Sequence, residues 1–179
     1  MKALSSLILV SVFTLIQTSF AQEEEWKEIT SMDRKITAVA PGEAENLVMT
    51  KRTLAGKMTT NIKRFATDSI IIDLSYTAVS PKVIKFAGKE GIYKNSKGKV
   101  LQESMGKEKS FADYEVNGVT CKLLRYHMIH PDDKNHEDYE GLALMLAMDD
   151  GLYVANGVVL KEDGMEAVVK FRDSIVIRP

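Results

Sequence analysis

A run of seven apolar residues, 142–148, constrains the fold more than any other stretch of the chain. An uninterrupted apolar run of this length predicts a strand buried on both faces, because a strand with one wet face alternates in polarity. A helix is also consistent with the run, but Gly141 before it and the Asp149-Asp150-Gly151 turn after it favour a strand. Residues 119–129 and 152–160 are mostly apolar as well, so the centre of the fold is expected here.

Turn signals divide the rest of the chain. Asn117 and Gly118 tolerate positive φ and predict a tight hairpin. Ser80 followed by Pro81 predicts the start of a helix that Gly88 keeps short, with residues 95–99 as a flexible connector. The expected elements are strands at 36–40, 47–54, 57–66 and 69–79, a short helix after Pro81, extended chain at 100–115, strands at 119–129, 142–148 and 152–160, a helix within 161–173 and a strand at 174–177.

This order predicts a single α+β domain with a central antiparallel sheet. Strands buried on both faces need cover on both sides, so we expect helices on both faces of the sheet, an α/β/α sandwich. Residues 35–179 are assigned to the domain, which is long enough to fold without a disulfide or a metal. Residues 22–34 are assigned to a leader and first turn, and residues 1–21 to a signal peptide.

The signal peptide is predicted from three features at the start of the chain. Lys2 supplies a positive charge, residues 7–16 an apolar core, and Ser19-Phe20-Ala21 small residues for cleavage. The alternative, a membrane anchor, needs about 20 apolar residues, and this run is shorter and is broken by Ser11 and Thr14. We therefore expect a bacterial protein that is periplasmic or secreted, without a transmembrane segment in the mature chain.

The charge is nearly balanced, with 24 Lys and Arg against 25 Asp and Glu. This total points to no nucleic-acid partner, and we expect a protein partner in the periplasm or outside the cell. Residues 51–109 are basic, however, with 13 Lys and Arg against 5 Asp and Glu. A basic face for an anionic partner or membrane surface is one reading; neutralisation by the acidic segments within the fold is favoured.

All three histidines fall in one acidic stretch, residues 126–140. Histidine and carboxylate side chains bind zinc and similar ions, so this stretch is the candidate metal site. A solvated acidic loop after Pro131 is the favoured alternative, because two histidines three apart on a strand point to opposite faces. The candidate ligands of a divalent metal are His127, His130, Asp132, Asp133 and His136.

No enzyme motif is present: the chain lacks a Gly-x-Ser-x-Gly elbow, a His-Glu-x-x-His helix and a phosphate-binding glycine loop. We therefore predict no catalytic residues and a protein that is not an enzyme. Cys121 is the single cysteine. It cannot form an internal disulfide, and we expect it to be a buried, unreactive thiol.

Four loose patterns resemble the Mog/PsbP-like family of α/β/α sandwiches. They are the strand at 36–40 with its Pro41-Gly42 stop, the hairpin at 117–119, the opening of a strand at 151–153 and the closing segment 171–175. The family includes photosystem accessory subunits, a nuclear GTPase-binding protein and exported bacterial proteins of unknown role. The resemblance implies a non-enzymatic binding or accessory module, with a metal or small-ligand carrier as the alternative, but places no functional residue on this chain.

Overall fold

The computed structural model describes residues 25–53, 56–129 and 138–178, and the expected signal peptide lies outside them. Within these ranges the chain forms strands β1 Lys27–Thr30, β2 Ile36–Ala40, β3 Glu45–Thr53, β4 Gly56–Ala66, β5 Ile70–Ala78, β6 Lys107–Val116, β7 Val119–Ile129, β8 Asp138–Ala147, β9 Gly151–Leu160 and β10 Val176–Ile177, and helices α1 Pro81–Glu103 and α2 Glu166–Asp173, with a short 3-10 turn at Lys161–Asp163.

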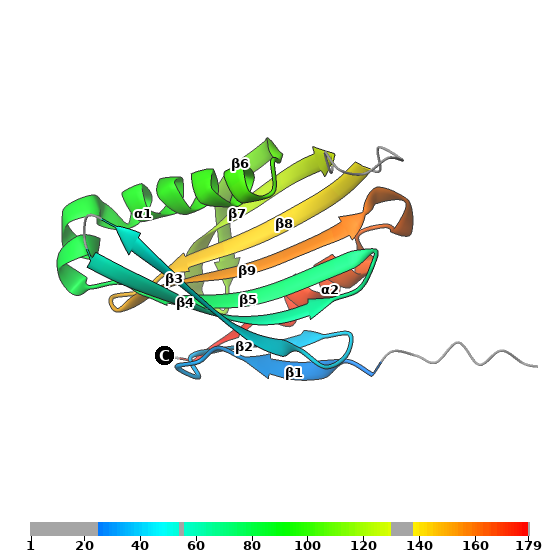
Figure 1. Ribbon diagram of the computed structural model, residues 1–179, viewed down its shortest axis with the longest axis horizontal. Coiled ribbons are helices and arrows are strands. Elements are labelled where there is room, and N and C mark those ends of the chain that lie inside the picture. The colour runs from blue at the N-terminus through cyan, green and yellow to red at the C-terminus, as the bar shows by residue number, and fades with distance from the viewer. Residues whose placement is uncertain (1–24, 54–55, 130–137, 179) are drawn as a thin grey trace, which may run out of the picture.

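The strands form two antiparallel sheets. The large sheet has seven strands in the order β3-β4-β5-β9-β8-β7-β6, and the small sheet has three in the order β1-β2-β10. The small sheet brings distant parts of the chain together, since Val176 of β10 lies opposite Thr37 of β2. In Figure 1, α1 runs along one side of the large sheet, and β1 and β2 lie on the opposite side.

One side of the large sheet, here called the helix face, packs against α1. Ile92 and Tyr93 of the helix are buried against Leu124, Ala143 and Met145 of the sheet. The Tyr93 hydroxyl accepts a hydrogen bond of 3.2 Å from the backbone N–H of Ala147, which ties the helix to the end of β8. The Tyr93 hydroxyl thus provides a hydrogen-bond partner for the Ala147 N–H, which has none within the sheet.

The other side of the large sheet, here called the groove face, packs against the small sheet and α2. Ile36 of β2 and Ile177 of β10 join Leu144 of β8 and Phe171 of α2 in one buried cluster. Two layers of apolar strands therefore meet here, as in packed sheets.

The expected α/β/α sandwich is wrong. The structure is mostly β, and the groove face is covered chiefly by the three-stranded sheet, with only the eight-residue α2 beside it. The burial expected for residues 142–148 is correct, since every residue of β8 from Gly141 to Ala147 is buried. Burial on both faces shows that each face is covered, but it does not distinguish a helix from a second sheet.

Two elements differ from those expected. The helix after Pro81 runs to Glu103, through the expected connector at 95–99 and the start of the extended segment at 100–115. The reason is an apolar stripe that continues past the glycines, with Val100 and Leu101 packed against the helix-face core. β1 falls within the expected leader, which gave no strand signal. The meander of β3, β4 and β5 and the hairpin at Asn117-Gly118 are confirmed.

Glycine permits one close approach on the helix face. Tyr126 is fully buried and lies across Gly141 of the neighbouring strand, where an added Cβ would sit only 2.3 Å from the ring. The Tyr126 hydroxyl thereby reaches β9, where it donates a hydrogen bond of 2.8 Å to Asn156. A side chain at position 141 would push the Tyr126 ring away and break its hydrogen bond to Asn156.

Candidate binding groove

A groove lies between the turn that joins β1 to β2 and the outer strands of the large sheet. It encloses about 420 Å³, within the size range of small-ligand sites. Its floor crosses β5, β4 and β3 and so extends to the edge of the sheet. The lining residues are Thr30, Ser31, Met32 and Arg34 of the turn, Asn46, Leu47 and Val48 of β3, Asn61, Ile62 and Lys63 of β4, and Leu74 of β5.

The turn between β1 and β2, which forms one wall of the groove, is closed by hydrogen bonds. The Ser31 backbone N–H donates to Ile36 at 2.8 Å, and that of Arg34 donates to Ser31 at 2.9 Å. The buried Ser31 hydroxyl donates to Asp33 at 2.8 Å and accepts from the Ile36 N–H at 3.0 Å. Arg34 has a φ of 64°, a left-handed value that side chains adopt only when their surroundings fix them. The wall is therefore a fixed structure.

Tyr153 anchors this wall to the large sheet. Its hydroxyl donates a hydrogen bond to the Asp33 carboxylate, while its ring is 1% exposed and packs 5.0 Å from the ring of Tyr76, between centroids. Burial raises the pKa of Tyr153, and the hydrogen bond and charge of Asp33 raise it further. The phenol thus stays protonated and remains a donor. Lys35 and Asp150 add an ion pair at 2.5 Å beside it.

The groove carries two positive charges without local neutralisation. Arg34 and Lys63 both line it, and neither forms an ion pair with any carboxylate in the described part of the chain. Arg64, next along β4, points to the opposite face and pairs with Asp73 through two hydrogen bonds of 2.7 Å. Asp73 belongs to the basic segment itself, so this pair is not the neutralisation expected from the acidic segments; the pair of Lys109 with Glu140 is of that kind. The groove stays cationic.

Apolar surface adjoins these charges. Met32 on the turn is 68% exposed and Val48 on β3 is 66% exposed. Covering these side chains with apolar groups of a ligand would remove apolar surface from water, which is favourable. The arrangement suits a ligand that combines a negative charge with apolar groups.

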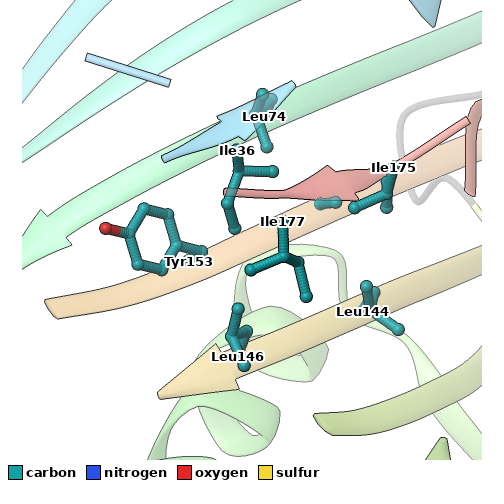
Figure 2. A pocket seen from close by; sticks show the side chains of 8 residues that line it. Ile36, Leu74, Leu144, Leu146, Tyr153, Ile175 and Ile177 are labelled. Atoms are coloured by element: carbon teal, nitrogen blue, oxygen red, sulfur yellow. The ribbon is translucent and has the colours of Figure 1, made fainter. Parts of the chain in front are cut away.

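A second, internal cavity lies between the two sheets (Figure 2). It encloses only about 10 Å³ and is lined by Ile36, Leu74, Leu144, Leu146, Tyr153, Ala155, Ile175 and Ile177. This volume is at the lower limit for a single water molecule, which would also need polar partners. The cavity is a gap in the packing rather than a ligand site.

The candidate metal ligands fall almost entirely outside the described residues. His130, Asp132, Asp133 and His136 lie within residues 130–137, so the predicted site is not described. His127 lies on β7, opposite Lys107 and Glu140, and its Nδ1 is buried without a hydrogen-bond partner among the described residues. Elsewhere in 25–53, 56–129 and 138–178, no three His, Cys, Asp or Glu residues gather to hold a metal. The metal site stays a prediction.

Cys121 is buried, as expected from the sequence. Its thiol donates a weak hydrogen bond to the carbonyl of Tyr114 at 3.1 Å. Burial, with the nearby charge of Asp113, raises the pKa of the thiol to about 11. A thiol held protonated in the core is a poor nucleophile.

The residues of the groove gave little signal in the sequence. Asn46 and Val48 share a face only because β3 alternates regularly, and the turn at 31–35 contains no glycine or proline to mark it. Lys63 stands beside Arg64 in the sequence, yet the two side chains lie on opposite faces of the sheet. The alternation of side chains along a strand is enough to predict that Lys63 and Arg64 lie on opposite faces.

Comparisons with known proteins identify no family for this chain. No family model matches the chain, and no curated protein is significantly similar to it. One solved structure, of a Pseudomonas aeruginosa protein of unknown function, is 12% identical, covers 74% of this chain and 98% of its own, and has a TM-score of 0.45. So distant a likeness carries no functional argument. The Mog/PsbP-like resemblance therefore stays a prediction from short patterns. No helix in the described ranges is long and apolar enough to cross a membrane.

Proposed function

We propose that this protein is an exported, non-enzymatic binding module whose groove takes a segment of a protein partner. The observation that supports the proposal is the pairing of two unneutralised cations, Arg34 and Lys63, with the exposed apolar side chains Met32 and Val48. A partner segment with a carboxylate next to an apolar residue satisfies both features. The carboxylate pairs with the cations, and the apolar side chain covers the exposed surface.

A binding role also fits the chemistry of the groove wall. Asp33, in the turn that forms this wall, is occupied by hydrogen bonds from Ser31 and Tyr153. The raised pKa of Tyr153 makes its phenol a structural donor rather than a base. These groups hold the wall in place, and the free side chains of the groove are those suited to recognition.

The proposal is tested with synthetic peptides of about eight residues, the length of a typical strand, that alternate glutamate with leucine. We expect them to shift the amide NMR signals of residues 30–34 and 61–63 on titration. Lys63→Glu is expected to weaken binding at least about tenfold, because it replaces an attraction with a repulsion in a half-buried groove. Affinity is measured by fluorescence anisotropy of the labelled peptide.

Two controls make this test specific. Lys57→Glu makes the same charge change on the same strand, at an exposed residue outside the groove lining, and is expected to have a much smaller effect. Peptides that alternate lysine with leucine test the charge preference. Equal affinity for the two peptides, or equal losses in the two variants, would contradict the proposal.

A further inference from the structure

The two edges of the large sheet differ in how they are protected. The outer strand β6 carries Lys107, Glu108 and Lys109 and is interrupted by a register shift between Glu108 and Ser110. A bulge of this kind interrupts the regular row of backbone groups that a further strand would pair with. At the other edge, β3 is nine residues long with an unbroken register against β4. Within the described part of the chain, it pairs with β4 alone.

The middle of β3 is apolar and exposed. Val48 is 66% exposed on the groove face, and Met49 is 54% exposed on the helix face. A long, regular edge strand with apolar side chains on both faces is a template for a further strand. We propose that a second copy of this chain pairs with β3 in antiparallel fashion, joining two seven-stranded sheets through a two-fold axis. The pairing uses the backbone edge of β3 and is tested without a groove ligand, although the pairing and the groove share Val48.

Symmetry restricts the register of such a pairing. A two-fold axis normal to the sheet keeps each face on its own side, and directly opposite residues in an antiparallel pair point to the same face. An even-numbered residue of β3 must therefore lie opposite an even-numbered residue of the second copy. Only every second register meets this condition.

In one permitted register, the side chains of β3 are complementary to those of β3 in the second copy. With Val48 opposite Val48 of the second copy, Leu47 lies opposite Met49, and Asn46 lies opposite Thr50. Glu45 then lies opposite Lys51, so the dimer contains two such charge pairs. Apolar residues meet apolar ones, polar meet polar, and each acid meets a base, which are the cross-strand pairs that stabilise sheets.

The neighbouring permitted registers lose this match. With Met49 opposite itself, Lys51 faces Leu47 and Arg52 faces Asn46. With Leu47 opposite itself, Glu45 faces Met49. Lys51 and Glu45 are both exposed, and neither forms an ion pair with another residue in the described ranges. Lys51 is therefore available to the second copy, and Glu45, which lies opposite Arg64 of β4 and is attracted by its charge, keeps an exposed carboxylate for that pair.

The pairing would place the two grooves on one side of the joined sheet. Val48 borders the groove and also lies on the two-fold axis in the matched register. Val48 would then pack against its own symmetry mate, so in the dimer Met32 would supply the exposed apolar surface of each groove. Two copies would present a continuous floor that runs from one β5 to the other.

The test is a charge-swap experiment with the protein expressed from its full sequence and purified in the form that the cell produces. Sedimentation velocity over a concentration series is expected to show a monomer–dimer equilibrium that weakens with added salt, since the pairs are exposed. Glu45→Lys and Lys51→Glu, each alone, should raise the dimer Kd about tenfold, because each creates two like-charge pairs. An equimolar mixture of the two variants should restore dimer formation as a mixed dimer with opposite charges in both pairs.

The matched control is Glu115→Lys, which makes the same charge change at an exposed residue of β6 and should leave the dimer Kd unchanged. The double variant Glu45→Lys with Lys51→Glu should recover the wild-type Kd. A wild-type protein that stays monomeric up to about 1 mM, the weak limit of specific association, overturns the proposal. So does a Glu45→Lys variant that behaves like Glu115→Lys, or a mixture that fails to dimerise.

Discussion

A single hydroxyl group, that of Tyr153, connects the core of this protein to its groove. The ring belongs to the core between the sheets, and the hydroxyl leaves it to hold Asp33 in the groove wall. A hydrogen bond to a charged acceptor contributes more than one between neutral groups. Loss of the hydroxyl therefore leaves the Asp33 carboxylate at the edge of the core with one hydrogen-bond donor fewer.

Tyr153→Phe is expected to lower the free energy of unfolding by about 1–3 kcal/mol and to weaken binding of the glutamate–leucine peptide, because the wall loses its anchor. Urea unfolding followed by circular dichroism measures the first effect and anisotropy the second. Lys35→Ala, which removes the partly exposed ion pair with Asp150, serves as control and should change stability much less. A Tyr153→Phe protein as stable as wild type would show that the hydroxyl has no anchoring role.

Among the elements, α1 shows how one residue divides a helix. Gly88 has φ 68° and ψ 162°, so the helical segments on either side meet at a kink. The segment after the kink holds Ile92 and Tyr93 against the sheet, whereas Phe86 before it is 96% exposed. Only glycine occupies such φ/ψ values at low cost.

Two glycines of α1 are therefore expected to respond in opposite ways to alanine. Gly88→Ala should destabilise the protein by about 1–3 kcal/mol, because its backbone conformation is unfavourable for any side chain. Gly98→Ala should stabilise it by roughly 0.5–1 kcal/mol, because Gly98 is helical and an added Cβ meets no atom within 4 Å. Thermal unfolding of both variants measures these two changes in stability. A stabilised Gly88→Ala protein would mean that the helix is straight at this point.

The strands were more predictable than the layers that cover them. Alternation in β5 and the unbroken apolar run of β8 are local patterns, so the sequence alone locates these strands. The three-stranded sheet depends on residue pairs such as Thr37 with Val176, which are far apart in the sequence and carry no local signal. The groove could not be predicted for the same reason, since Asp33 and Tyr153 are separated by 120 residues.

At the scale of the whole molecule, buried phenols and one buried thiol set its response to alkaline pH. Burial raises the pKa values of Tyr93, Tyr126 and Tyr153, and that of Cys121 to about 11. The folded protein therefore keeps protons that the unfolded chain releases. Their contribution to stability is complete below the unfolded pKa values and declines as the pH rises above them.

We expect the free energy of unfolding to be constant up to about pH 8, above which the unfolded thiol ionises, and to fall more steeply above about pH 10 with the unfolded phenols. Urea unfolding at a series of pH values measures this decline. Ultraviolet absorbance should show tyrosinate from the buried phenols appearing together with unfolding. Stability that does not change between pH 8 and 11 would contradict the burial of these groups.

The small sheet also determines when this protein can fold. β2 lies between β1, which precedes it directly, and β10, which is made from the last residues that the structure describes. Ile175 and Ile177 are buried between the sheets, so the groove face of the large sheet is not fully covered until they arrive. A chain emerging from the ribosome cannot complete this core until residues 175–177 have emerged and can pack. Closure of the groove face is therefore a late step of folding, because the pairing of β10 with β2 joins residues that are far apart in the sequence.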